Sequence, residues 1–189
     1  MKRNNKYEKI ISAATSLISA EGYEKASLRK IADKVGLQKS SLFYYLKGKQ
    51  ELLPRIIDIS VDEVIMCIKK INANNELEPE EKLKRAFDTH LILMTKYFDS
   101  VNIYLNQTGS LSKKNQRVYL GKKREYEKEF EKIILKMKRK GYFKKLNTRI
   151  VCFGLLGMLN WVTKWYKADE RSNIKEISNV FYKIIVERN

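Results

Sequence analysis

Residues 27–53 read SLRKIADKVGLQKSSLFYYLKGKQELL, and this stretch predicts two short helices joined by a tight turn. Ser27 stands just before the apolar positions of the first helix, where its side-chain oxygen can accept a hydrogen bond from a free backbone amide. Gly36 is expected to end that helix, and residues 38–46 to form the second. Two short helices connected by a glycine-containing turn make a helix-turn-helix unit.

The residues before this stretch predict a third helix. Apolar side chains recur at helical spacing over residues 5–20, and Gly22 follows as a C-terminal stop. The chain has only two prolines and eight glycines among 189 residues, a composition that favours long helices over short strands and tight turns. We therefore expect an all-α protein, with a three-helix domain over residues 1–48 and a larger helical domain over residues 49–189.

Helical periodicity continues through the larger domain. Asparagine, glycine and proline separate the periodic segments, because each of these residues disfavours continuation of a helix. The helices predicted there cover residues 49–72, 80–105, 113–140, 148–166 and 174 to the C-terminus.

The charge of the chain points to an anionic partner. Lys and Arg total 39 against 22 Asp and Glu, which gives a net charge of +17 at neutral pH. Such a chain is attracted to phosphate-rich polyanions, because binding them releases condensed counterions. A general preference for lysine across a proteome would produce the same excess, and composition alone does not separate these two explanations.

Cysteine and histidine usage argues against a metal site. Cys67 and Cys152 lie far apart among apolar neighbours, and His90 is the single histidine, so the chain cannot supply the closed set of sulfur and nitrogen ligands that zinc needs. We expect two reduced thiols in a cytoplasmic protein without a metal or cofactor. The first 22 residues do not resemble a signal peptide, and no run approaches 18 consecutive apolar residues, so we expect no membrane segment.

Catalytic motifs are not found in the sequence. There is no phosphate-binding P-loop, no GxSxG and no GxGxxG, and His90 has no acid or nucleophile close to it in sequence. We therefore expect that the protein is not an enzyme and that His90 is a core or pocket residue.

The helix-turn-helix stretch has the residue types that reading DNA requires. Reading the major groove needs a helix presented to the base edges, a second helix that braces it, and cations or hydroxyls that fix the flanking phosphates. Apolar residues such as Leu28 and Leu42 are expected to hold the two helices together. Lys30 and Lys34 are explained equally well by contact with DNA and by a solvated helix face. The candidate DNA-binding residues are Ser27, Arg29, Gln38, Lys39, Ser40, Ser41, Tyr44, Tyr45 and Lys49.

The stretch AATSLISAEGYEKASLRKIADKVGLQKSSLFYYLKGKQELL, residues 13–53, resembles the N-terminal region of the tetracycline-repressor (TetR) family. The positions that match that family's pattern are Gly22, Tyr23, Ser27, Ile31, Ala32, Gly36, Ser41, Leu42, Tyr45, Lys49 and Leu52. The positions that depart from it are Ala26, Gln38, Phe43, Leu46 and Gly48. Gln38 is a poorer N-cap than the usual serine, and Phe43 lacks the hydroxyl of the usual tyrosine.

The resemblance implies a homodimeric, all-helical repressor that binds a palindromic DNA operator and releases it when a small effector enters the larger domain. In this family the last two helices usually form a four-helix dimer interface, which here implies Thr148–Tyr166 and Ile174–Glu187. Gly154 and Gly157 flank two leucines in the first of these segments, and small residues allow close approach between helices.

The segment GLLGMLNWVTKWYKADERSNIKEI, residues 154–177, is similar to the C-terminal signature of one TetR subgroup, written G-x-x-N-W-x-x-x-W-[YF]. Characterised members of that subgroup commonly respond to acyl-coenzyme A (acyl-CoA) esters, which combine a phosphate-rich head with an apolar tail. Residues 113–145 carry fourteen Lys or Arg against four Glu, a cationic segment that suits such a head. Solvation alone also accounts for these lysines.

The candidate effector-binding residues divide into two groups by chemistry. Cationic and aromatic or polar residues are candidates for the head of the ligand: Arg117, Arg124, Asn160, Trp161, Lys164 and Trp165. Apolar residues are candidates for its tail: Phe87, Leu91, Met94, Phe98, Leu105 and Phe130. Two alternatives stay open: a multidrug-sensing repressor of an efflux gene, and an architectural DNA-binding protein that needs no effector.

Overall fold

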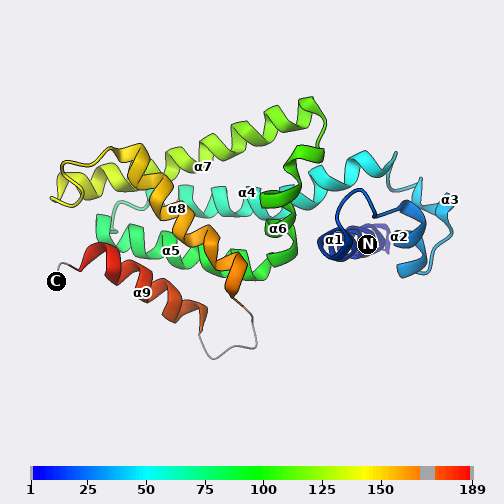
Figure 1. Cartoon of the computed structure of the whole chain (residues 1–189), viewed down its shortest axis with the longest axis horizontal. Coiled ribbons are helices and arrows are strands. Elements are labelled where there is room, and N and C mark those ends of the chain that lie inside the picture. Colours follow the sequence, from blue (N-terminus) through cyan, green and yellow to red (C-terminus); the bar gives the residue numbers. More distant parts are fainter. Residues whose placement is uncertain (1, 167–172, 188–189) are drawn as a thin grey trace. The chain divides into compact units, whose positions relative to one another are not determined.

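The structure is a computed structural model that describes residues 2–166 and 173–187, with side chains described from Asn5 onward. Every regular element in these two ranges is helical, which confirms the predicted all-α fold (Figure 1). The N-terminal helices are α1 (Lys2–Glu21), α2 (Leu28–Lys34) and α3 (Lys39–Leu42). The remaining elements are η1 (Lys49–Glu51), α4 (Leu52–Ala73), α5 (Pro79–Lys96), α6 (Phe98–Gln107), η2 (Thr108–Ser110), α7 (Lys113–Arg139), α8 (Thr148–Trp165) and α9 (Ile174–Val186).

The chain divides into two compact units. The first contains the residues up to Val61 together with Tyr97–Leu120, and the second contains Asp62–Lys96 together with the residues from Gly121 onward. In the first unit α1 packs against α2 and α6, and α2 packs against α3. In the second unit α5 packs against α8 and α9.

The first helix of the helix-turn-helix, α2, begins and ends as the sequence predicts. The Ser27 side-chain oxygen accepts a hydrogen bond from the Lys30 backbone amide at 3.2 Å, which satisfies one of the free amides at the start of α2. Gly36 adopts a positive φ of 65°, a backbone conformation that glycine reaches without strain, and the chain turns there toward α3. Ile31 and Leu42 are fully buried, so they hold α2 and α3 in place.

The second helix of the unit is shorter than predicted. The regular α-helix covers only Lys39–Leu42, and turns continue to Tyr45, so the prediction of a helix over residues 38–46 is wrong in length. Gln38 forms no side-chain cap, as its residue type suggests. The amides of Phe43 and Tyr45 donate to the carbonyls three residues earlier, at 3.2 and 2.9 Å, which tightens the last turn into 3₁₀ geometry.

The prediction of one helix over residues 80–105 is also wrong. The chain breaks at Tyr97, whose φ of −116° and ψ of 34° are not helical, and this break separates α5 from α6. The Thr95 hydroxyl donates to the backbone carbonyls of Leu91 and Ile92, at 3.2 and 2.8 Å. A threonine hydroxyl bonded to the preceding turn often bends a helix. The spacing of apolar residues, on which the prediction was based, does not reveal such a bond.

The core of the second unit comes from the apolar stripes that the sequence predicts. On α5 the side chains of Leu83 and Phe87 are fully buried, and on α7 the same holds for Phe130 and Met137. Caps fix where α8 and α9 begin, since the side chain of Asn147 accepts from the amides of α8 and that of Asn173 from the amides of α9. Among the described residues, none of the helices combines the length and the apolar character that crossing a membrane requires.

Candidate nucleic-acid interface and effector site

The segment from Gln38 to Tyr44 presents an exposed face on the first unit. The side chains of Gln38, Lys39 and Ser40 are exposed, and the ring of Tyr44 is 81% exposed. An aromatic ring with so much free surface does nothing for the core of its own chain. Phe43, the residue before it in the sequence, is also exposed, at 53%, but its ring has no hydroxyl.

The other candidate DNA-binding residues brace this face or flank it. Ser27 uses its oxygen as the cap of α2, and Arg29 is exposed on that helix. Lys49 donates to the Glu24 carbonyl at 3.0 Å, and its ammonium lies 4.5 Å from the centre of the Tyr23 ring. The hydrogen bond and the cation–π contact together hold the Lys49 side chain in place at the start of η1. Ser41 and Tyr45 are half-buried, so they pack as well as face solvent.

In the second unit, the predicted apolar tail residues lie in the interior. Phe87, Leu91, Met94 and Phe130 are all buried, and they come from α5 and α7. Tyr126 packs edge-on against Phe130, with ring centres 5.2 Å apart.

One polar cluster interrupts this apolar interior. His90 Nδ1 and the Tyr126 hydroxyl are 2.5 Å apart, and His90 also shares a hydrogen bond with the side chain of Asn160 on α8. Burial lowers the pKa of His90 to about 4, and the bond to Asn160 opposes that shift only in part. The imidazole is therefore neutral at physiological pH and offers one donor and one acceptor. Tyr126 was not a predicted site residue, because nothing in the sequence pairs it with a histidine 36 residues away.

Four of the predicted residues for the ligand head lie at the surface of the second unit, whereas Asn160 is half-buried beside His90. Arg124 and Lys164 are exposed, and the rings of Trp161 and Trp165 are 65% and 40% exposed. Three predicted ligand residues, Phe98, Leu105 and Arg117, belong to the first unit instead. The second unit contains the other nine predicted effector residues, namely Phe87, Leu91, Met94, Arg124, Phe130, Asn160, Trp161, Lys164 and Trp165.

Helices α8 and α9 expose large apolar side chains. Ile150, Phe153, Trp161, Val180 and Ile184 are each between 44% and 71% exposed. Gly154 and Gly157 open the surface of α8 further, because a Cβ built at either position meets no atom within 4 Å. An exposed apolar surface of this kind is typical of a protein interface.

In the described parts of the chain, no group of three or more His, Cys, Asp or Glu residues is arranged to hold a metal ion. Cys152 is buried, which raises the pKa of its thiol to about 12, so this cysteine remains a protonated core residue.

Comparison with known families matches most of the chain. Residues 76–188 match the family described as "Tetracyclin repressor-like, C-terminal domain", and residues 10–56 match "Bacterial regulatory proteins, tetR family". The chain belongs to the TetR family. The resemblance seen in the sequence is thereby confirmed, and the helix-turn-helix lies inside the N-terminal match.

Individual TetR relatives cover the chain to different extents. The fatty acid metabolism regulator protein of Bacillus subtilis (strain 168) is 22% identical over 187 residues, which is 96% of this chain and 94% of that protein. The uncharacterized HTH-type transcriptional regulator YvdT of the same organism is 38% identical over 66 residues, but those are 35% of this chain and 34% of YvdT. The crystal structure of AibR in complex with isovaleryl coenzyme A and operator DNA has a TM-score of 0.85 at 23% identity, covering 95% of this chain and 97% of AibR. This likeness shows that the two chains share a fold.

Proposed function

We propose that this TetR-family protein is a ligand-responsive repressor that leaves a palindromic DNA operator when an acyl-CoA binds. Residues 1–48 act as the DNA-reading domain, and residues 49–189 bind the effector and form a homodimer. The protein has no catalytic activity and works in the cytoplasm. The observation that carries the proposal is the exposed face of Gln38, Lys39, Ser40 and Tyr44, held on a capped and buried helix-turn-helix core.

This face suits recognition of the major groove. Gln38 and Ser40 carry hydrogen-bonding groups that fit base edges, and Lys39 and Tyr44 reach phosphates or bases at its border. Lys49, fixed by Glu24 and Tyr23, meets a flanking phosphate at the start of η1. A rigidly held cation costs little conformational entropy on binding, which favours its use as a phosphate anchor.

Dimerisation follows from the apolar surface of α8 and α9. A palindromic site needs two copies of the reading domain related by a twofold axis, and a self-complementary surface provides that symmetry. The exposed side chains of Phe153 and Ile184 supply apolar area for such a contact, and the glycines of α8 allow close approach.

The acyl-CoA part of the proposal is supported by the second unit and by two relatives. Its interior is built from apolar residues, and the His90, Tyr126 and Asn160 cluster is a polar point within it, suited to the carbonyl of a thioester. Arg124 and Lys164 at the surface suit the phosphates of the head. One relative regulates fatty acid metabolism and one neighbour binds isovaleryl coenzyme A, as their descriptions state.

The test has two steps. First, duplexes that the purified protein retains are selected from a random pool, and the enriched site is used in gel shifts with competitor DNA. An operator-specific dimer favours its site by roughly 10³ or more over unrelated duplexes, whereas an architectural protein binds all of them about equally. Second, acyl-CoAs of several chain lengths are titrated into the operator complex. Release by none of them, together with release by cationic drugs, would replace the acyl-CoA proposal with the multidrug-sensing one.

A further inference from the structure

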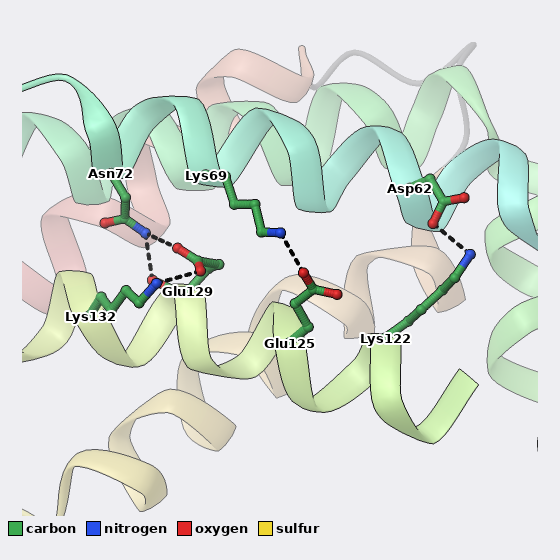
Figure 2. Close-up of polar contacts among 7 residues, drawn as sticks. All are labelled: Asp62, Lys69, Asn72, Lys122, Glu125, Glu129 and Lys132. Atoms are coloured by element: carbon green, nitrogen blue, oxygen red, sulfur yellow. Dashed lines mark hydrogen bonds and ion pairs between the residues drawn. The ribbon is translucent and has the colours of Figure 1, made fainter. Parts of the chain in front are cut away.

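A ladder of polar contacts joins α4 and α7 within the second unit (Figure 2). Asp62 pairs with Lys122 at 2.6 Å, and Lys69 pairs with Glu125 two turns further along α4. Figure 2 shows both lysines and both carboxylates pointing between the two helices. These ion pairs therefore place charged groups along the line of contact between α4 and α7.

The ladder ends at a buried carboxylate. Glu129 is only 5% exposed, and the Asn72 side-chain amide donates to its carboxylate at 2.8 Å and to its backbone carbonyl at 2.9 Å. Lys132 pairs with the other carboxylate oxygen at 2.6 Å. The ion pair with Lys132 offsets the charge of this carboxylate, and the amide of Asn72 satisfies its second oxygen.

Directly beside this end of the ladder lies a groove of about 530 Å³ between α4 and α7. Its walls carry four cations, Lys69, Lys132, Lys136 and Arg139, against the single carboxylate of Glu129. Ala73 and Leu135 supply an apolar part of the wall. A concave site of this volume holds a small organic ligand, and its cationic lining selects one with several negative charges.

A buried lysine lies against two residues of the groove. Lys82 on α5 is 2% exposed, and its ammonium donates to the Asn72 carbonyl at 3.0 Å. Lys136, which lines the groove, lies close enough to Lys82 for their two charges to repel each other. Ammonium groups have three donors and no acceptor, so neither lysine satisfies the other. Burial lowers the pKa of Lys82, and the neighbouring Lys136 lowers it further.

A phosphate group in the groove relieves this repulsion. Its oxygens accept from Lys136, and its negative charge favours the protonated form of both lysines. Lys69 and Lys132 already pair with carboxylates, but both lysine side chains are about half exposed, so their ammonium groups also have room for a phosphate oxygen.

We propose that the groove between α4 and α7 is a binding site for a small molecule with two or more phosphate groups, held by Lys132, Lys136 and Arg139. Ala73 and Leu135 contact the organic part of that molecule. The site is made of residues other than the apolar interior around His90, and it requires neither DNA nor an acyl chain. It therefore goes beyond the proposed function and stands or falls separately from it.

Isothermal titration calorimetry on the full chain tests this site, with inorganic pyrophosphate as the first ligand and ADP as the second. The double variant Lys132→Gln/Lys136→Gln removes two cations of the groove. The variant Lys114→Gln/Lys128→Gln removes the same charge from exposed positions of the same helix outside the groove. Thermal melts of both variants confirm that the fold is intact.

The expected result is saturable binding at one site per chain. Loss of two charge-assisted contacts weakens binding by about a hundredfold in the groove variant, and the control stays within about twofold of the unchanged protein. Tighter binding of ADP than of pyrophosphate identifies a phosphorylated organic ligand, and equal binding identifies the free anion. The proposal is overturned if neither ligand binds saturably, or if the groove variant loses no more affinity than the control.

Discussion

Protonation of His90 gives the sharpest quantitative test of the second unit. Burial lowers the pKa of this histidine from 6.5 to about 4, so the unfolded chain takes up a proton at a higher pH than the folded chain. The resulting stability is fully present above the unfolded pKa and is lost as the pH falls toward the folded one. The full loss amounts to about 3 kcal/mol, and about 2 kcal/mol of it falls between about pH 7.5 and about pH 5.

Urea unfolding of the unchanged protein and of His90→Gln at these two pH values isolates this contribution. Glutamine keeps hydrogen-bonding groups for Tyr126 and Asn160 but does not titrate. Hydrogen bonds and ion pairs with Lys140 and Lys69 lower the pKa values of Glu78 and Glu125, so these pairs also stabilise the fold less at acid pH. This effect is the same in the unchanged protein and in the variant. The unchanged protein should therefore lose about 2 kcal/mol more than the variant.

A direct reading is available as well, because His90 is the only histidine in the chain. Its ring protons give one set of NMR signals, whose titration midpoint should lie near 4 in the folded protein. A midpoint near 6.5, or equal acid sensitivity in the two proteins, would refute the burial of a neutral imidazole in this cluster.

Three further substitutions test other parts of the account. Ser27→Ala removes the cap of α2 and should lower the free energy of unfolding by about 1 kcal/mol in chemical denaturation. Tyr44→Ala should leave stability within about 0.5 kcal/mol, because the ring is 81% exposed, yet weaken operator binding in gel shifts. Ile184→Glu places a charge on the apolar surface of α9 and should convert a dimer into a monomer in analytical ultracentrifugation, whereas Lys175→Glu on the same helix should not.

The N-terminal fold was readable from sequence because its signals are local. A serine before an apolar period and a glycine after it mark the ends of α2, and the structure places a cap and a positive φ at those residues. The bounds of α3 could not be predicted in the same way, since Gln38 gives no cap at its start and its last turn tightens through backbone bonds that no residue type specifies.

The second half shows the limit of periodicity. The apolar stripe of α5 predicts the buried residues correctly, but it runs on past Thr95 without any sign of the break before α6. The polar cluster illustrates the same limit for the site. Asn160 was found through a motif, whereas its partners His90 and Tyr126 come from two other helices and meet only in the folded chain.

Selection of DNA sequences by the purified full-length protein tests the central claim most directly. The account predicts enrichment of one palindromic site, bound by two copies of the chain, and loss of that preference in Lys39→Ala and Tyr44→Ala while both variants keep their fold. Retention of unrelated duplexes without enrichment of any sequence, or an enriched site that both variants bind as tightly as the unchanged protein, would contradict it.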